Sequence, residues 1–129
     1  MKRIHLYRGK RLDNGQWIEG SLIGEDVIVG KIVDFEEDYF TTEFWYKVDP
    51  ETVGQFTGRY DKNDKEIFER DIVVNKNIHG KKWIVEYRTD SEYVGFVLKE
   101  IGTNGISLFT SWNDIEVIGN IHDNKEFLK

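Results

Sequence analysis

The strongest constraint on the fold of this chain is that its apolar residues occur only in short runs. No unbroken apolar run exceeds three residues, as in 27–29 and 72–74. Elsewhere apolar and polar residues alternate, for example in 3–7 and 83–88. A period of two is typical of half-buried strands, and turn-forming residues separate these segments. The sequence therefore predicts many short strands and no amphipathic helix longer than two turns.

The N-terminal part predicts a β-hairpin followed by two further strands. The hairpin covers 3–23 and turns at Asp13-Asn14-Gly15, because Asn and Gly tolerate the positive φ of tight hairpin turns. The strands that follow cover 27–35 and 39–48. We expect the faces of the second to carry Phe40, Phe44 and Tyr46 on one side and Tyr39, Trp45 and Lys47 on the other. One face should pack on the core, and the other should meet a second layer or another subunit.

The C-terminal half predicts a small barrel. A short helix start at Asp49-Pro50-Glu51 and a second helical turn at 66–71 precede it. Five strands are then expected between 71 and 121, enough for an SH3-like β-barrel. We expect Trp83 in its core. The fold class is mainly β, in a single domain over 1–129, with an N-terminal β region at 1–58 and the barrel subregion at 59–129.

Composition places the chain among folded proteins of a reducing compartment. Aromatic residues make up 14% of the chain, whereas disordered chains are poor in them. The absence of cysteine excludes disulfides, thiolate zinc sites and a cysteine nucleophile. The short apolar runs provide neither a signal peptide nor a membrane span. We therefore expect a cytoplasmic protein that does not enter a membrane.

Charge is unevenly distributed along the chain. Residues 1–12 contain five basic residues and no acidic one, although the net charge is −6. Much of the acidic excess lies in 34–51, a segment in which Lys47 is the only basic residue. Such segments serve a partner, pair within the molecule or between copies, or are solvated surface charge. Overall acidity argues against a dedicated nucleic-acid binder.

The sequence shows no reaction centre. The three histidines lie in separate segments without metal-ligand spacing: His5, His79 and His122. Residues 61–64 open like a calcium loop, but Glu66 and Ile72 stand where such a loop needs Gly and Glu. A solvated turn explains this segment better. We predict no catalytic, metal or cofactor site, no cofactor and no enzymatic activity.

Several phrases resemble the YopX family of phage and prophage proteins. They occur in order along almost the whole chain: RGK at 8–10, DNGQW at 13–17, VDPETVGQFTG at 48–58, DKNDKEIF at 61–68, DIV at 71–73 and EVIGNI at 116–121. The phrase at 48–58 is long and unusual, which makes the resemblance specific. It implies an uncharacterised phage-encoded protein with an SH3-like β-barrel, made in a bacterial host. The family has no established activity, so no functional residue is carried over.

Two positions depart from the family pattern. Asp64 and Arg70 stand where glycines are expected, which indicates either different turn geometry or turns that tolerate a side chain. We expect Asp71 to accept hydrogen bonds from nearby backbone amides at the start of the barrel. Residues 49–71 then have a structural role or, alternatively, form a surface loop that docks a partner.

The function predicted from sequence is that of a non-enzymatic, self-associating or protein-binding β module. Its partner would be a second copy, or a host or phage protein. One alternative is a small β-barrel that binds nucleic acid, since basic and aromatic residues mix near the N-terminus and around residues 76–83. An enzyme of unknown reaction is a second alternative. The candidate interaction surface consists of Arg3, Arg8, Lys10, Arg11, Trp45, Lys81 and Lys82.

Overall fold

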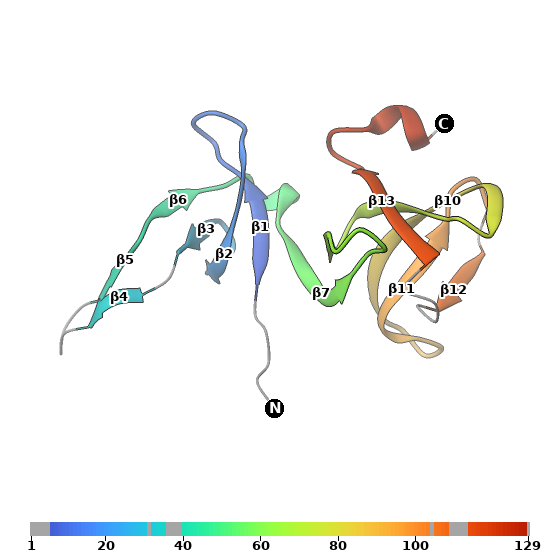
Figure 1. The fold of residues 1–129 in the computed structure, drawn as a ribbon. Coiled ribbons are helices and arrows are strands. Elements are labelled where there is room, and N and C mark those ends of the chain that lie inside the picture. Colours follow the sequence, from blue (N-terminus) through green and yellow to red (C-terminus); the bar gives the residue numbers. More distant parts are fainter. Residues whose placement is uncertain (1–5, 31, 36–39, 104, 109–113, 129) are drawn as a thin grey trace. The chain divides into compact units, whose positions relative to one another are not determined.

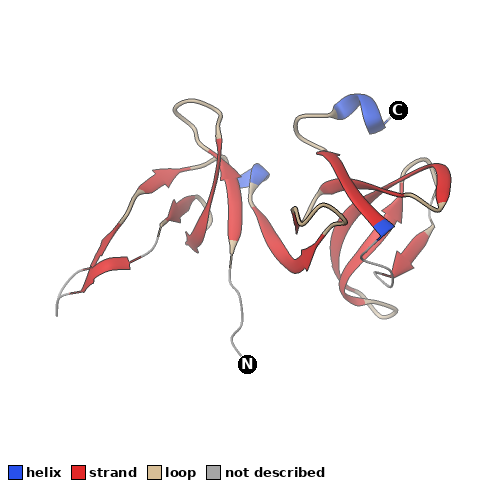
Figure 2. Ribbon diagram, in the orientation of Figure 1, coloured by secondary structure: helices blue, strands red, loops and turns tan. Residues whose placement is uncertain are grey.

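The computed structural model describes residues 6–30, 32–35, 40–103, 105–108 and 114–128, which are mostly antiparallel strands (Figure 1). Two short 3₁₀ helices, η1 (Pro50–Thr52) and η3 (Lys125–Leu128), complete the regular structure (Figure 2). The chain divides into two compact units, Met1–Phe56 and Thr57–Lys129. The boundary predicted from the sequence, between the N-terminal β region and the barrel subregion, lies between residues 58 and 59. The mainly-β prediction is confirmed.

The first unit is built on an antiparallel sheet in the order β6-β3-β2-β1-β7. The strands are β1 (Tyr7–Lys10), β2 (Trp17–Ile23), β3 (Val27–Val29), β6 (Trp45–Lys47) and the first residues of β7 (Gly54–Tyr60). A separate two-stranded sheet consists of β4 (Ile32–Phe35) and β5 (Phe40–Thr42). The predicted hairpin is confirmed, with Lys10 opposite Trp17 and Gly15 at a φ of 72° in the turn.

The predicted continuous strands 27–35 and 39–48 are wrong, because each is split in two. β3 ends before Gly30, whose N–H donates to the Phe44 carbonyl at 2.9 Å, and a bend at Glu43 precedes β6. The predicted faces hold for the side chains that the structure describes. Phe44 and Tyr46 stack with ring centroids 5.8 Å apart, while Trp45 and Lys47 are exposed. Tyr39 and Phe40 lie outside the described side chains.

The interior of the first unit is narrow. Ile28 and Val48 are fully buried, and Gly9 packs against both of them. Gly20 allows β2 and β3 to approach closely, because a Cβ at this position would collide with the Val29 carbonyl oxygen. An isolated bridge between Arg11 and Val48 brings the end of β1 beside the end of β6.

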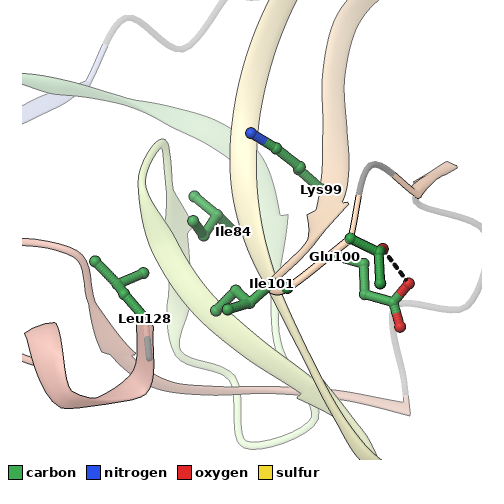
Figure 3. Close-up of a pocket in the computed structure, with 7 residues that line it drawn as sticks. Ile84, Lys99, Glu100, Ile101 and Leu128 are labelled. Atoms are coloured by element: carbon green, nitrogen blue, oxygen red, sulfur yellow. Dashed lines mark hydrogen bonds between the residues drawn. The ribbon is translucent and has the colours of Figure 1, made fainter.

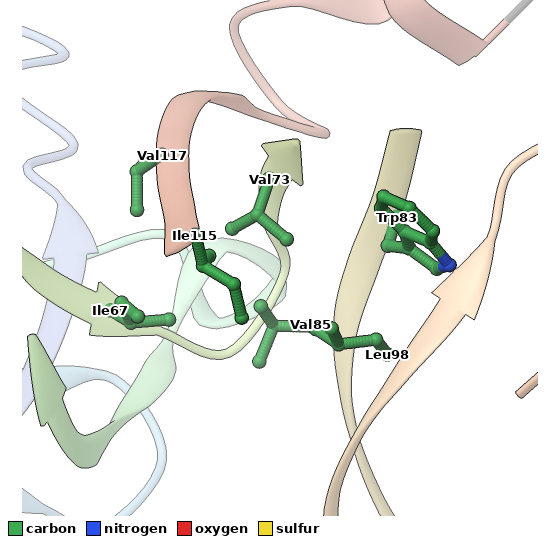
Figure 4. Packing of buried hydrophobic residues seen from close by; sticks show 7 residues of the cluster. All are labelled: Ile67, Val73, Trp83, Val85, Leu98, Ile115 and Val117. Carbon is green, nitrogen blue, oxygen red and sulfur yellow. The ribbon is translucent and has the colours of Figure 1, made fainter. Parts of the chain in front are cut away.

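The second unit contains a five-stranded antiparallel sheet in the order β12-β11-β10-β9-β13. Its strands are β9 (Asp71–Asn75), β10 (Ile78–Thr89), β11 (Val94–Glu100), β12 (Ile106–Leu108) and β13 (Ile115–Asn120). One face carries the main hydrophobic cluster: Ile67, Val73, Trp83, Val85, Leu98, Ile115 and Val117 (Figure 4). The core position predicted for Trp83 is confirmed. Within the described residues these strands form an open sheet rather than a closed barrel.

One of the two predicted helical turns is confirmed. In η1 the Asp49 carboxylate accepts from the Glu51 N–H at 3.1 Å, and Pro50 occupies the first turn. The turn predicted at 66–71 is wrong, because β8 (Glu66–Phe68) occupies its first half. The Asp71 carboxylate accepts from the Phe68 N–H at 2.8 Å, which confirms the predicted role of Asp71.

Asp64 and Arg70 keep the backbone geometry of the glycines they replace. Their φ angles are 61° and 73°, in the left-handed region that favours glycine. The Asp64 N–H closes its turn on the Asp61 carbonyl at 3.0 Å, and the Arg70 N–H donates to the Val85 carbonyl at 2.7 Å. Both turns therefore hold a side chain in a conformation that favours glycine, as one of the two alternatives predicted.

The Asp61 carboxylate ties the 61–65 turn to β13. One oxygen accepts from the Asn63 and Lys65 N–H groups at 2.8 and 2.9 Å, and the other accepts from the Val117 N–H at 2.9 Å. Asp61 is only 5% exposed, so the expected solvated turn is wrong at this residue. Burial opposes ionisation, but the three N–H donors and the Lys65 charge outweigh it and hold the pKa of Asp61 below its ordinary value.

Replacing Asp61 with Asn should lower the free energy of unfolding by about 2–3 kcal/mol at pH 7. An amide group would turn its own N–H toward the Val117 N–H, leaving a buried donor unsatisfied and removing the charge from the other bonds. Urea unfolding measures the difference. Asp64→Asn, an exposed change in the same turn, should cost less than about 0.5 kcal/mol.

The cost of Asp61→Asn should also depend on pH. Because the folded pKa of Asp61 lies below that of the unfolded chain, its carboxylate stabilises the fold fully above about pH 5. This contribution is lost as the pH falls below about 4 and through the folded pKa. The two proteins should therefore converge in stability on acidification. A difference that stays constant to about pH 2 would contradict this account.

Candidate functional site

On the outward side of β1 and β2, two basic residues of the predicted interaction surface lie beside an aromatic ring. Because side chains alternate along a strand, Arg8 and Lys10 lie on the side opposite the buried Gly9. Trp17 faces Lys10 directly across the hairpin. The Arg8 guanidinium carbon lies 4.7 Å from the Trp17 ring centroid, and the Lys10 ammonium nitrogen lies 5.5 Å from it. Both cations are therefore within cation–π distance of one ring.

Arg11 is held in place by a second aromatic ring and a carboxylate. Its guanidinium carbon lies 3.6 Å from the Tyr46 ring centroid. Its Nε and Nη2 atoms donate to the two oxygens of Asp13 at 2.9 and 2.6 Å. This side-chain hydrogen bonding raises the pKa of Arg11 and lowers the pKa of Asp13. The stacked, bidentate arrangement fixes Tyr46 and Asp13 relative to each other.

An open groove of about 410 Å³ lies beside this pair, and we call its lining the Trp45 surface. It consists of Leu12, Asp13, Trp45, Tyr46 and Lys47. Leu12 and Trp45 are each 62% exposed, although both are large and apolar. The Leu12 N–H donates to the Lys47 carbonyl at 3.0 Å, which places the end of β1 against β6. The groove therefore combines apolar walls with one acidic and one basic side chain.

The structure brings together only part of the surface predicted from sequence. Arg8, Lys10, Arg11 and Trp45 all belong to the first unit, whereas Arg3 lies outside the described residues. The groove residues Leu12, Tyr46 and Lys47, and the ring of Trp17, were missed. Leu12 could have been found from the alternation of side chains along β1. A residue two positions after Lys10 is expected on the same side of the strand as Lys10.

The other two predicted residues, Lys81 and Lys82, belong to the second unit. The Lys81 ammonium pairs with Glu100 at 3.2 Å, and the Lys82 ammonium lies 5.8 Å from the Phe127 ring centroid. The Thr103 hydroxyl donates to Glu100 at 2.7 Å, and this bond, followed by the one from Lys81, lowers the pKa of Glu100. Both lysines therefore have partners within the chain.

A pocket of about 380 Å³ lies beside Glu100 (Figure 3). Ile84, Ile101 and Leu128 form its apolar part, with Leu128 contributed by η3. A carboxylate that accepts hydrogen bonds from a hydroxyl and an ammonium group is held in its ionised form. It is therefore poorly suited to donating a proton. Among residues 6–30, 32–35, 40–103, 105–108 and 114–128, no three His, Asp or Glu residues are grouped to hold a metal ion.

The fold and the exposed groove define a mainly β protein with an exposed aromatic surface. The chain matches the YopX protein family over residues 6–129, and it belongs to that family. No curated protein sequence matches it. No helix in the described part is long and apolar enough to cross a membrane.

A solved structure has a similar fold. It is the crystal structure of protein EF1440 from Enterococcus faecalis, with a TM-score of 0.63 and 21% sequence identity. The similarity covers 99% of this chain and 100% of the other chain. At this identity the likeness concerns the fold alone.

Substitutions on the Trp45 surface should leave the fold intact. We expect Trp45→Lys and Leu12→Lys to change the free energy of unfolding by less than about 0.5 kcal/mol, because both side chains are mostly exposed. Ile28→Ala, at a fully buried position of the same unit, should cost about 2–5 kcal/mol. Urea unfolding followed by circular dichroism compares the three. A loss above about 2 kcal/mol for Trp45→Lys would assign Trp45 to the core.

Proposed function

We propose that this chain is a non-enzymatic interaction protein that binds another protein through the Trp45 surface. The observation that carries the proposal is the exposure of Trp45 and Leu12 together in one groove. Tryptophan is enriched among the residues that dominate binding energy at protein interfaces. Two large apolar side chains held beside each other mark a binding surface better than scattered exposed residues do.

The surroundings of the groove favour binding without rearrangement. Tyr46 is covered by the Arg11 guanidinium, and Arg11 is held in turn by Asp13. A wall fixed before the partner arrives loses less conformational entropy on association. Asp13 and Lys47 provide opposite charges at the polar rim, which favour one orientation of a partner over others.

The non-enzymatic part of the proposal is supported by how the buried polar side chains are used. Each buried polar residue of the described chain accepts a hydrogen bond from a backbone N–H group: Thr52, Asp61, Asp71 and Asn120. Such groups stabilise turns and strand ends rather than face a substrate cleft.

Contacts within the chain also favour a protein partner over nucleic acid. Arg11 pairs with Asp13 and Lys81 pairs with Glu100, so these charges are partly neutralised within the chain. Trp17 already contacts Arg8 and Lys10, which competes with base stacking on its ring. The net charge of −6 adds long-range repulsion from phosphates.

We also infer that the second unit is an SH3-like barrel in opened form, and that the protein is encoded by a phage or prophage and acts in the bacterial cytoplasm. The connectivity supports the first inference, since β13 returns to pair with β9, the first strand of its sheet. The family resemblance supports the second.

Photo-crosslinking in bacterial cells that express the chain tests the proposal. Trp45 is replaced by the photoreactive residue p-benzoylphenylalanine, and Val94, which is 82% exposed in the second unit, is replaced in a matched control. We expect a discrete protein adduct from position 45 that is absent from position 94. An adduct of twice the chain's mass identifies a second copy, and any other mass identifies a different protein. No adduct at position 45, or the same adducts at both positions, would contradict the proposal.

A further inference from the structure

The exposed apolar side chains of the first unit extend beyond the groove. Ile23 of β2 faces Val27 of β3, and Val27 faces Lys47 of β6. Leu12 faces Lys47 from the outer side of β6, where its N–H donates to the Lys47 carbonyl. Facing residues of antiparallel strands point to the same side of a sheet. These four side chains form one row on the outward side, because the residue after Val27, Ile28, is fully buried on the other side.

Lys47 is the charged member of this row, and its neighbours are apolar. Val27 and Leu12 lie on its two sides, and Trp45 lies two residues before it on the same side of β6. Ile23 is 45% exposed, and Leu12 and Trp45 are more exposed still. A partner that buries these apolar side chains therefore also covers Lys47.

The other charges beside the groove are engaged within the chain. The Asp13 carboxylate accepts from Arg11 through both of its oxygens, and the Lys10 ammonium lies 5.5 Å from the Trp17 ring centroid. In the part of the chain that the structure describes, no carboxylate or aromatic ring is paired with the Lys47 ammonium. Lys47 is therefore the charge on this face that is left for a partner.

Covering Lys47 has a consequence for the chemistry of the partner. An ammonium group that loses its water without gaining an anion costs more free energy than the burial of one apolar side chain returns. A carboxylate placed against the ammonium offsets this cost, whereas a second cation adds repulsion to it. The row therefore favours a partner that brings a carboxylate flanked by apolar side chains.

We propose that the partner of the Trp45 surface binds through a segment in which an Asp or Glu residue stands beside large apolar residues. Its carboxylate pairs with the Lys47 ammonium, and its apolar side chains pack on Trp45, Leu12 and Ile23. This inference rests on the proposed function and states the chemistry of the partner.

The separation of Trp45 and Lys47 sets the spacing within the partner segment. Two residues along a strand are about 6.5 Å apart. The acidic residue and its apolar neighbour therefore lie about two positions apart in an extended segment, or about three to four positions apart on one face of a helix.

Ribosome display of short random peptides tests this inference before any partner is known. The baits are the wild-type chain, Lys47→Glu, Trp45→Lys and, as a matched control, Lys125→Glu. Lys125 is an exposed lysine of the second unit, so its reversal changes the net charge equally but leaves the Trp45 surface unaltered. Urea unfolding confirms that each bait is folded.

Peptides selected on the wild-type chain and on Lys125→Glu should carry an acidic residue at the stated spacing from a large apolar one more often than the unselected library does. They should bind Lys47→Glu at least about tenfold more weakly and should lose binding to Trp45→Lys. Peptides selected on Lys47→Glu should instead carry Lys or Arg at the acidic position.

Two results would overturn the inference and leave the proposed function standing. They are Trp45-dependent peptides without a preference for acidic residues, and Trp45-dependent peptides that bind the wild-type chain and Lys47→Glu equally well. A selection that yields no Trp45-dependent peptide also overturns the inference. Photo-crosslinking at position 45 then decides the proposed function separately.

Discussion

The structure depends on the alternation of side chains along its strands. Each strand is hydrogen-bonded to a neighbouring strand on one side or on both sides. In the first unit this alternation buries Gly9, Ile28 and Val48 and turns Arg8, Lys10 and Trp45 outward. The unit has a narrow interior, so the aromatic side chains on the outward side have no core to enter. Trp17 is covered by cations, whereas Trp45 is left mostly exposed. The exposure of Trp45 is thus a direct consequence of side-chain alternation around a narrow interior.

The edge strands β13 and β6, in two different sheets, are covered in different ways. Along β13, the Ile115 carbonyl accepts from the Lys62 N–H, the Val117 N–H donates to Asp61, and the Asn120 N–H donates to Asn124. This edge is blocked by local turns, as soluble β proteins require to avoid unwanted pairing. Along the outer side of β6, the Leu12 N–H donates to the Lys47 carbonyl and the Asp49 N–H donates to the Lys10 carbonyl, so the end of β1 covers one end of this edge. Both edges are thus partly covered by nearby backbone, and Asp61 has a structural role at the edge of β13.

Sequence reasoning found the local features whose signal lies within a few residues. The Asn14-Gly15 turn, the Asp49 cap and the burial of Trp83 depend on local turn chemistry or period-two alternation, and all three could be predicted. The helical turn at 66–71 was predicted because residues 58–64 were interpreted as a polar loop, whereas β8 pairs with β7, the strand just before it, across a turn closed by the Asp61 N–H and the Lys65 carbonyl. The Trp45 surface was predicted only in part because it joins distant segments: the Leu12 N–H reaches the Lys47 carbonyl across 35 positions of sequence.

Amide hydrogen exchange at β6 tests the central claim most directly. The Tyr46 N–H lies within the β3–β6 ladder and is protected in every state, so it serves as an internal reference. Because the Tyr46 N–H points into the β3–β6 ladder and the Trp45 N–H points away from it, Tyr46 should exchange much more slowly than Trp45. Exchange at Trp45 that is as slow as exchange at Tyr46 would contradict the account.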